Sequence, residues 1–214
     1  MAIKVAGLTR ITDKEKVFST LLDAFEEYPK LSKAFPEKDR RLIAIEATVR
    51  YYASYDMRYG RAYSLDSSCK EVVLLVNSRR MRYTKLKHIL AGSYSSRYKR
   101  VISKLTDEER IRRVEIFEEM NEMEKELKFP KHHIYIDFLG VKNQYQRQGR
   151  GRMIMEEVIS YSEEVDLPLM LFTNTTEDVR FYQSLGFRAV GITSSKKFKF
   201  INTYLVREVS SGKR

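Results

Sequence analysis

Apolar positions in the first part of the chain recur at helical spacing, behind one short apolar run. Residues 3–8 form that run and predict a first strand. Thr12 and Glu15 form a capping box that opens a helix, and Pro29 ends it. Residues 40–55 repeat the helical period and predict a second helix.

Two strand-like stretches, 61–65 and 71–76, follow and are separated by the turn sequence Asp-Ser-Ser. This pattern predicts a β-hairpin. The next region, 79–104, has a helical pattern that breaks at 92–96. The expected order is therefore strand, two helices, hairpin and then further helices.

The second half begins with a β-rich run, HIYIDFLGV, at 133–141. From Gly149 a helix carries apolar residues at helical spacing, and LPLMLF then predicts a compact strand over 168–173. A strand, a helix and a strand in succession form a βαβ unit, so the two strands should lie parallel. The remaining elements expected are a helix over 176–185 ending at Gly186 and two strands over 187–190 and 199–206.

The composition fits one globular domain. The chain has 214 residues, of which 43% are apolar and 12% aromatic, and no repeat or linker divides it, so we expect a single domain over 1–214. The lone cysteine, Cys69, excludes an intramolecular disulfide framework. No apolar run reaches the ~18 residues of a membrane helix, and MAIKVAGLTR lacks the apolar stretch of a secretory signal. We therefore expect a cytoplasmic protein that does not enter a membrane.

Positive charge is concentrated in one region. The 40 Lys and Arg exceed the 29 Asp and Glu by 11, and residues 79–113 hold twelve Lys/Arg against three Asp/Glu. A second capping box, Thr106 with Glu109, opens a helix there that extends to about residue 127. Its later part, 115–126, reverses sign with six Glu. One interpretation is a set of helices with solvated faces; the other is an anionic partner, either nucleic acid or a phosphorylated cofactor.

The loop QRQGRG at 146–151 lies between the strand and the helix of the βαβ unit. A helix N-terminus has unpaired N–H groups and a partial positive charge, which together suit a phosphate. Gly149 and Gly151 would let the backbone approach that phosphate closely. The arginines that add positive charge here are Arg147, Arg150 and Arg152.

Two competing phosphate motifs are absent from this loop. A GxGxxG motif would need a third glycine at Ile154, and a P-loop would need Gly-Lys-Ser/Thr. A glycine pair at a strand–helix turn is by itself also compatible with an ordinary turn.

The wider context of the loop favours a cofactor site. Residues 146–151 read as Gln/Arg-x-x-Gly-x-Gly/Ala after a strand, and residues 181–187 read as Phe-Tyr-x-x-x-Gly-Phe. Together with the strand at 133–141, these segments resemble the GNAT superfamily of acyl-CoA-dependent N-acetyltransferases. The resemblance is specific over about residues 131–208, which would be the cofactor-binding half. Before residue 131 only the order of elements agrees.

The resemblance implies a mixed α/β fold of the α+β type. The expected architecture is one domain with a twisted, mostly antiparallel sheet and helices on both faces. Strands 133–141 and 168–173 would form a parallel pair that splays at its C-terminal end to admit the cofactor.

The resemblance also implies an enzyme that transfers the acetyl group of acetyl-CoA to a primary amine by direct attack, without a metal. Tyr182 holds the family's usual position for the general acid that protonates the CoA thiolate. A phenol with a reference pKa of about 10 can donate to a thiolate, whose thiol has a pKa of about 8.5. Core packing is the other interpretation of Tyr182. The cofactor contacts implied are Leu139, Gly140, Val141, Gln146, Arg147, Gln148, Gly149, Arg150, Gly151, Arg152 and Asn174.

Two positions depart from the family pattern. Asn143 stands where the family often has a proline, and Asp178 stands where an asparagine is common, four residues before Tyr182. An amide contact from residue 178 to the cofactor is therefore in doubt, and Asn174 is its expected substitute.

The general base is left open by the sequence. Asp137 shares strand parity with His133 and is one candidate; Glu46 on the second helix and ordered water are the others. The histidines form no cluster at metal-ligand spacing, so we expect no metal. Cys69 lacks a recognisable nucleophile signature and is expected to be buried.

A binding protein is the rival interpretation. Its interface would be the basic stretch 79–113, where Tyr83, Tyr94 and Tyr98 are interleaved with Lys and Arg. Such aromatic side chains can stack on nucleic-acid bases, and an acidic protein is a second partner of this kind. The sequence leaves open which amine an acetyltransferase would use and what oligomeric state it would adopt.

Overall fold

One twisted sheet organises the protein. The computed structural model describes residues 3–81, 83–125 and 127–210, and within them seven strands form a sheet in the order β1-β2-β3-β4-β5-β7-β6. All neighbouring strands are antiparallel except the parallel pair β4–β5, as the sequence predicts. The strands are β1 (Thr9–Ile11), β2 (Arg61–Ser64), β3 (Glu71–Asn77), β4 (Ile134–Val141), β5 (Leu169–Thr173), β6 (Arg188–Ser194) and β7 (Ile201–Arg207).

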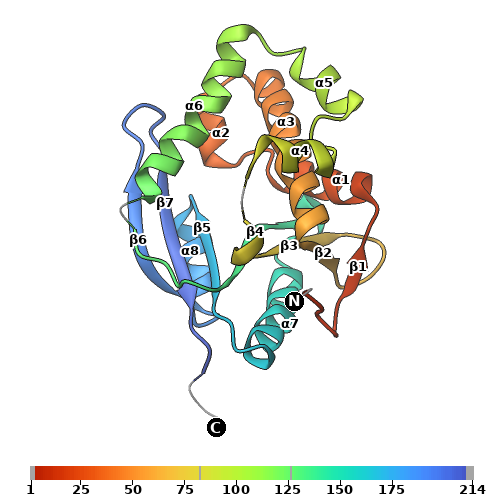
Figure 1. Cartoon of the computed structure of the whole chain (residues 1–214), viewed down its shortest axis with the longest axis vertical. Helices are drawn as coiled ribbons and strands as arrows, with labels where there is room; N and C mark the ends of the chain where they lie inside the picture. The colour runs from red at the N-terminus through yellow and green to blue at the C-terminus, as the bar shows by residue number, and fades with distance from the viewer. Residues whose placement is uncertain (1–2, 82, 126, 211–214) are drawn as a thin grey trace.

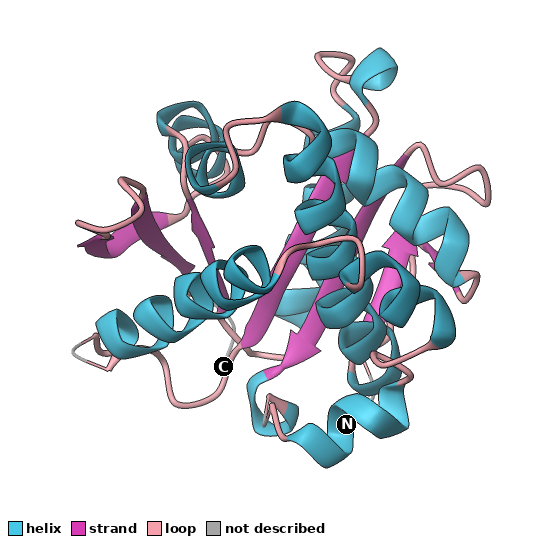
Figure 2. Cartoon of the chain, turned by 90° about the horizontal axis from the view of Figure 1, so that it is seen from above, coloured by secondary structure: helices cyan, strands magenta, loops and turns pink. Residues whose placement is uncertain are grey.

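Helices cover both faces of the sheet, as Figures 1 and 2 show. Alternate residues of β3 divide the interior into two cores, because side chains along a strand point to opposite faces. Val72 and Leu74 pack with α1, α2, α3 and α6, whereas Val73 and Leu75 pack with α7 and α8. The helices are α1 (Lys14–Ala24), α2 (Pro29–Ala34), α3 (Lys38–Tyr59), α4 (Lys85–Ala91), α5 (Ser96–Ile102), α6 (Asp107–Glu124), α7 (Arg150–Glu164) and α8 (Thr176–Gln183).

The N-terminal prediction is wrong in three details. Residues 3–8 are not a strand; they are an irregular segment whose apolar side chains pack against the α7 core, and β1 begins only at Thr9. The N-cap of α1 is Asp13 rather than Thr12, and its carboxylate accepts from the backbone N–H groups of residues 15 and 16. The first helix ends at Ala24, and Pro29 instead opens α2, where its missing N–H costs nothing.

Local end signals elsewhere are confirmed. Thr106 and Glu109 form the reciprocal capping box of α6. Gly186 adopts a left-handed conformation, with φ of +86°, just after α8. Across the described residues, no helix is both long and apolar enough to cross a membrane.

Candidate active site

The parallel strands β4 and β5 separate soon after they begin. Their ladder holds only two residue pairs, Ile134 with Leu169 and Tyr135 with Met170. Beyond these pairs β4 continues to Val141 and pairs with no strand other than β3, so its other edge is open to the cavity except at Val141, whose carbonyl accepts from the Gln146 side chain over 3.0 Å. The strands accordingly fall into two groups when the molecule is viewed from above (Figure 2).

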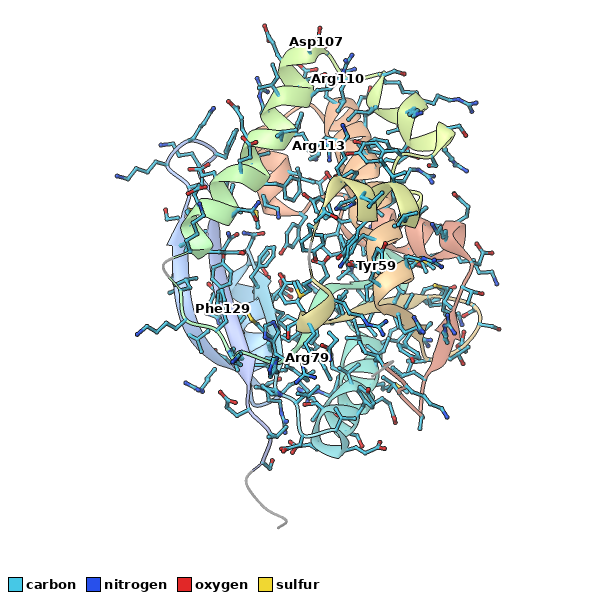
Figure 3. The ribbon with its side chains drawn as sticks, in the orientation of Figure 1. Tyr59, Arg79, Asp107, Arg110, Arg113 and Phe129 are labelled. Carbon is cyan, nitrogen blue, oxygen red and sulfur yellow. The ribbon has the colours of Figure 1, made fainter. Side chains whose placement is uncertain are left out.

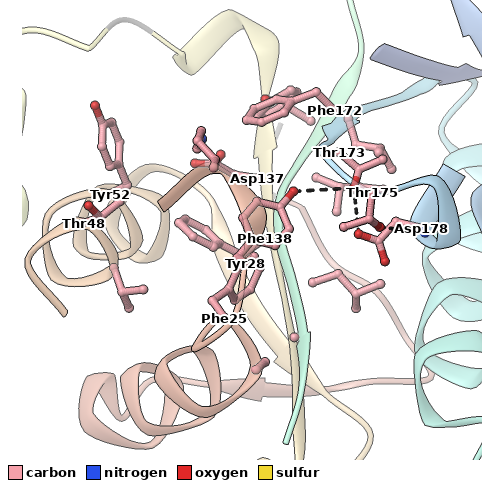
Figure 4. A pocket seen from close by; sticks show the side chains of 18 of the residues that line it. Phe25, Tyr28, Thr48, Tyr52, Asp137, Phe138, Phe172, Thr173, Thr175 and Asp178 are labelled. Atoms are coloured by element: carbon pink, nitrogen blue, oxygen red, sulfur yellow. Dashed lines mark hydrogen bonds between the residues drawn. The ribbon is translucent and has the colours of Figure 1, made fainter. Parts of the chain in front are cut away.

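A cavity of about 1280 Å³ occupies this opening. On one side it reaches the 146–152 loop, the end of β4 and α8; we call this the cofactor side. On the other it extends between α2, α3 and α6; we call this the acceptor side. Figure 4 shows Asp137 between Tyr52 of α3 and Phe172 of β5, where the two sides meet.

The 146–152 loop presents bare backbone N–H groups to the cavity. Gly149 is the N-cap of α7, with φ of +77°, a conformation that favours glycine. No side chain among the described residues caps this helix end. The N-terminus of α7 therefore retains the hydrogen-bonding capacity and partial charge that bind a phosphate.

Gly151 is open to substitution on steric grounds. A Cβ atom placed there would meet the Phe181 ring at 3.7 Å and Val141 at 3.8 Å, which are ordinary contacts. Since the fold does not require glycine at this position, the space it leaves in the cavity is free for a ligand.

The three arginines of this region have different roles. Arg150 donates to Glu71, a fully buried carboxylate, and also pairs with Asp66, so its side chain anchors the loop to the β2–β3 hairpin. Arg152 donates to Ser184 over 2.7 Å. Arg147 lines the cavity, and no group in the described residues pairs with its guanidinium.

Two of the predicted cofactor contacts lie outside the cavity lining, and a third, Gln146, lines the cavity but donates its side-chain amide to the Val141 carbonyl and to Asn143. The Asn174 amide donates to the Ile201 carbonyl and to Asn202, both on β7, and Asn174 does not line the cavity. Gln148 donates to the Gln144 carbonyl within its own loop and is also absent from the lining. The other predicted contacts line the cavity: Leu139, Gly140, Val141, Gln146, Arg147, Gly149, Arg150, Gly151 and Arg152.

Both positions that depart from the family pattern have structural partners. Asn143 donates its side-chain amide to the Asp23 carbonyl over 3.0 Å, which ties the loop to the end of α1. Asp178 accepts from the Thr173 hydroxyl at 2.8 Å, beside the Tyr28 hydroxyl (Figure 4).

Tyr182 lies in the cavity wall and is 7% exposed. Burial raises its pKa well above the usual phenol value, and the neighbouring Asp178 and Tyr28 act in the same direction. Its ring packs against Phe181 and Phe187. Within the described residues no group hydrogen bonds to its hydroxyl. Packing therefore fixes the ring, and the protonated hydroxyl is left available.

Asp137 is directed into the cavity by a β-bulge. Leu74 opposes Phe138 and Leu75 opposes Ile136, so Asp137 is an extra residue on β4 without a partner on β3. A bulge of this kind redirects a side chain from the alternation of its strand.

The Asp137 carboxyl group lies against that of Asp56, a fully buried residue of α3. Apart from Asp137, no group in the described part of the chain hydrogen bonds to the Asp56 carboxyl. Burial and the charge of Asp137 raise the Asp56 pKa well above its usual range, while burial also raises that of Asp137. Lys30 attracts the Asp137 charge, so we assign the shared proton to Asp56 and the negative charge to Asp137.

A family model for the GNAT acetyltransferase domain matches residues 107–189, from the start of α6 into β6. Over these residues the chain resembles the GNAT acetyltransferase domain. The match includes β4, the 146–152 loop, α7, β5 and α8, which are the elements on the cofactor side of the cavity. A search of curated protein sequences finds no match to the chain.

Solved structures agree with the fold of the whole chain. A Corynebacterium glutamicum structure, described as histone acetyltransferase HPA2 and related acetyltransferase, superposes with a TM-score of 0.60 at 16% identity, covering 97% of this chain and 98% of that one. Arylalkylamine N-acetyltransferase 2 from Aedes aegypti gives 0.59 at 11% identity, covering 95% and 98%. The C-terminal condensation domain of Ebony gives 0.62 at 6% identity, covering 94% and 98%. At such identities these likenesses concern the fold alone.

The basic stretch, 79–113, does not form one uniform surface. Tyr98 is buried and packs against Tyr51, as does Tyr94. Tyr83 lines the acceptor side of the cavity. Figure 3 shows Arg79, Arg110 and Arg113 spread along the length of the molecule. The interleaved tyrosines are therefore part of the interior and the cavity wall and are not arranged as a stacking platform.

The other candidate residues have ordinary surroundings. Glu46 pairs with Arg50 one turn away. Cys69 is buried, as expected. The described residues contain no group of three or more His, Cys, Asp or Glu side chains arranged to hold a metal ion.

Sequence reasoning missed the buried polar residues of the acceptor side of the cavity. Lys30 of α2 and Asp56 of α3 are both less than 10% exposed. Asp56 follows Tyr52 by four positions, so a carboxylate stands on the inward face of a helix. The carboxylate of Asp56 among the apolar positions of this helix face was the sequence feature that could have indicated a buried charge.

Proposed function

We propose that the protein transfers the acetyl group of acetyl-CoA to a primary amine. One observation carries the proposal: a single cavity joins the uncapped N-terminus of α7, the open edge of β4, the Tyr182 hydroxyl and the Asp137 carboxylate. The helix N-terminus would bind a phosphate, and the edge of β4 would bind an extended chain that contains amides. Tyr182 would face a leaving thiolate, and Asp137 would bind an ammonium group.

Coenzyme A would bind along the cofactor side. Its pyrophosphate would accept hydrogen bonds from the backbone N–H groups of the first turn of α7, with Arg147 adding positive charge. Its pantetheine amides would pair with the edge of β4 at residues 139–141, as a peptide adds to a sheet, and would displace the Gln146 side chain from the Val141 carbonyl.

Asp137 is the proposed general base. An amine bound beside it as an ammonium loses a proton to the carboxylate, and the freed lone pair attacks the thioester carbonyl carbon. The proton held on Asp56 keeps the pair at a single negative charge, since two adjacent carboxylates in a buried site do not both ionise. The raised pKa of Asp137 makes it a stronger base than an exposed aspartate.

Tyr182 is the proposed general acid. When the tetrahedral intermediate collapses, the carbonyl re-forms, the C–S bond breaks and the sulfur takes the phenolic proton. The nitrogen loses its second proton to solvent, and solvent reprotonates Tyr182. The raised pKa keeps the hydroxyl protonated throughout the neutral range, so a donor is always present. No covalent enzyme intermediate is needed.

A thiol-release assay tests the proposed function. The purified chain is incubated with acetyl-CoA and a panel of primary amines, and free CoA is measured against an amine-free control. Amine-dependent release with a matching N-acetyl product supports the proposal. Absence of acetyl-CoA binding at millimolar concentration would refute it.

A further inference from the structure

A buried lysine stands in the wall of the acceptor side. Lys30 is 7% exposed, and its side chain lines the cavity. Its ammonium lies over the rings of Phe117 and Phe172, at 5.1 Å and 4.9 Å from their centroids. Its hydrogen-bond acceptor is the Met120 sulfur at 3.3 Å, which is a weak one.

No carboxylate in the described residues lies within ion-pair distance of the Lys30 ammonium. Asp137 and Glu124 are near enough to attract it, but burial is the stronger effect and lowers its pKa to about 8. At neutral pH the group is therefore still mainly a cation. A buried cation without an oxygen acceptor is costly unless a ligand supplies one.

The remaining charges on this side are few. Asp137 carries the one charge that the Asp56–Asp137 pair holds, and Glu124 accepts from the Tyr204 hydroxyl at 3.1 Å. His88 and His133 add no positive charge at neutral pH, because burial lowers both of their pKa values. The Lys30 cation thus shares this space with two carboxyl groups: Asp137, which carries the negative charge of its pair, and Glu124, which is bonded to Tyr204.

The walls between these charges are aromatic. Tyr52 comes from α3, Phe117 from α6 and Phe172 from β5; Phe129 and Tyr135 also line the cavity. Such surfaces bind a flat or apolar body, and they strengthen charge interactions by excluding water.

We propose that the acceptor is a small zwitterionic amine, an amino acid with an apolar or aromatic side chain. The inference rests on the proposed acetyl transfer. The amino group binds at Asp137, where the reaction needs it, and the carboxylate binds the Lys30 ammonium. Phe117, Phe172 and Tyr52 surround the side chain. An amine without a carboxylate would leave Lys30 as unpaired as it is now.

A set of matched acceptors tests the contribution of the acceptor's own carboxylate. Phenylalanine, phenylalaninamide and phenethylamine share one aromatic body and differ in the group that would face Lys30. We expect kcat/KM for phenylalanine to exceed that of the other two by at least tenfold, a difference of about 1.4 kcal/mol. The same comparison extended to leucine, methionine and tyrosine, each with its amide, covers other apolar bodies.

A substitution of Lys30 tests whether this residue causes the preference for the acid. Lys30→Met replaces the ammonium by an apolar group beside Met120 and the two phenylalanine rings, a change that removes a buried charge and should leave the fold intact. We expect it to abolish the preference for the acid, measured as the ratio of kcat/KM for phenylalanine to kcat/KM for phenethylamine. Lys33→Met is the matched control, since Lys33 lies on the same helix but is exposed and donates to the Lys199 carbonyl.

Each outcome has one meaning. Acids preferred by the parent and not by Lys30→Met support the proposal. Equal or better use of the amides and amines, or a preference that survives in Lys30→Met, overturns it. If acetyl-CoA binds but no amino acid of the panel is acetylated, the zwitterion is wrong and the proposed acetyl transfer stands. If Lys30→Met does not fold, the acid-to-amide ratio of the parent alone decides.

Discussion

The two sides of the cavity are built by different means. The cofactor side depends on backbone groups from a continuous segment, residues 139–152, with the α7 helix end and the open edge of β4 as its donors and acceptors. The acceptor side depends on buried side chains from five separate elements, among them Lys30, Asp56 and Asp137. A site formed by backbone groups tolerates many side-chain substitutions, whereas a site formed by buried charged side chains depends on each of those side chains. Substitutions should therefore act differently on the two sides.

The largest effect is expected at Asp137. Asp137→Asn removes the base but keeps the shape of the side chain, and general-base catalysis contributes about 10²- to 10⁴-fold. We expect kcat to fall by about 10³-fold while the Kd for acetyl-CoA is unchanged. Glu46→Gln is the control, because Glu46 pairs with Arg50 and should leave turnover close to normal. Equal losses in both variants would refute the assignment of Asp137.

Tyr182→Phe should have the next largest effect. The ring would stay packed against Phe181 and Phe187, so only the donor is lost. We expect kcat to fall by about 10²-fold with little change in acetyl-CoA affinity. Single-turnover kinetics measures the chemical step directly. Normal single-turnover rates would show that Tyr182 only fills the core.

Arg150→Ala should reduce stability before it reduces affinity. It removes the cationic partner of the fully buried Glu71, which would keep only Ser64 and the Leu65 N–H as donors. We expect a loss of about 2 kcal/mol in the free energy of unfolding, measured by urea denaturation. Arg147→Ala is the matched control and should weaken acetyl-CoA binding slightly with no loss of stability. The opposite pattern would place Arg150 on the cofactor.

Gly151→Glu tests the cofactor side alone. A side chain fits there without a clash, but its carboxylate would occupy the space proposed for two phosphate charges. We expect acetyl-CoA affinity to fall at least about tenfold, with circular dichroism unchanged. Gly151→Ala adds only the Cβ atom and should bind nearly as the parent does. Equal affinity in the glutamate variant would show that the loop is an ordinary turn.

These two sides also differ in how far the sequence predicts them. The βαβ unit, the glycine pair and Tyr182 lie close together in sequence, so local pattern predicts their elements. Nine of the eleven cofactor contacts that the resemblance implies line the cavity. Asn174 was misplaced because its amide bonds to β7, a partner that no local pattern indicates.

Local sequence patterns could not predict the residues of the acceptor side. Asp137 enters the cavity through a bulge that exists only in the β3–β4 register. Lys30 is buried because α2 packs against α3 and its ammonium lies over Phe117 of α6 and Phe172 of β5. Pairings between distant segments decide both positions. The N-cap error at Thr12 is of a smaller kind, since Asp13 is an equally good capping residue one position later.

Hydrogen exchange with and without saturating CoA tests the central claim most directly. The claim is that the N-terminus of α7 and the open edge of β4 hold the cofactor. Slower exchange of backbone amides at residues 139–141 and 149–153 is the predicted result, with the amides of α4 and α5 unchanged. Exchange that stays the same at both segments with millimolar CoA, or slows only within residues 79–113, would contradict the account.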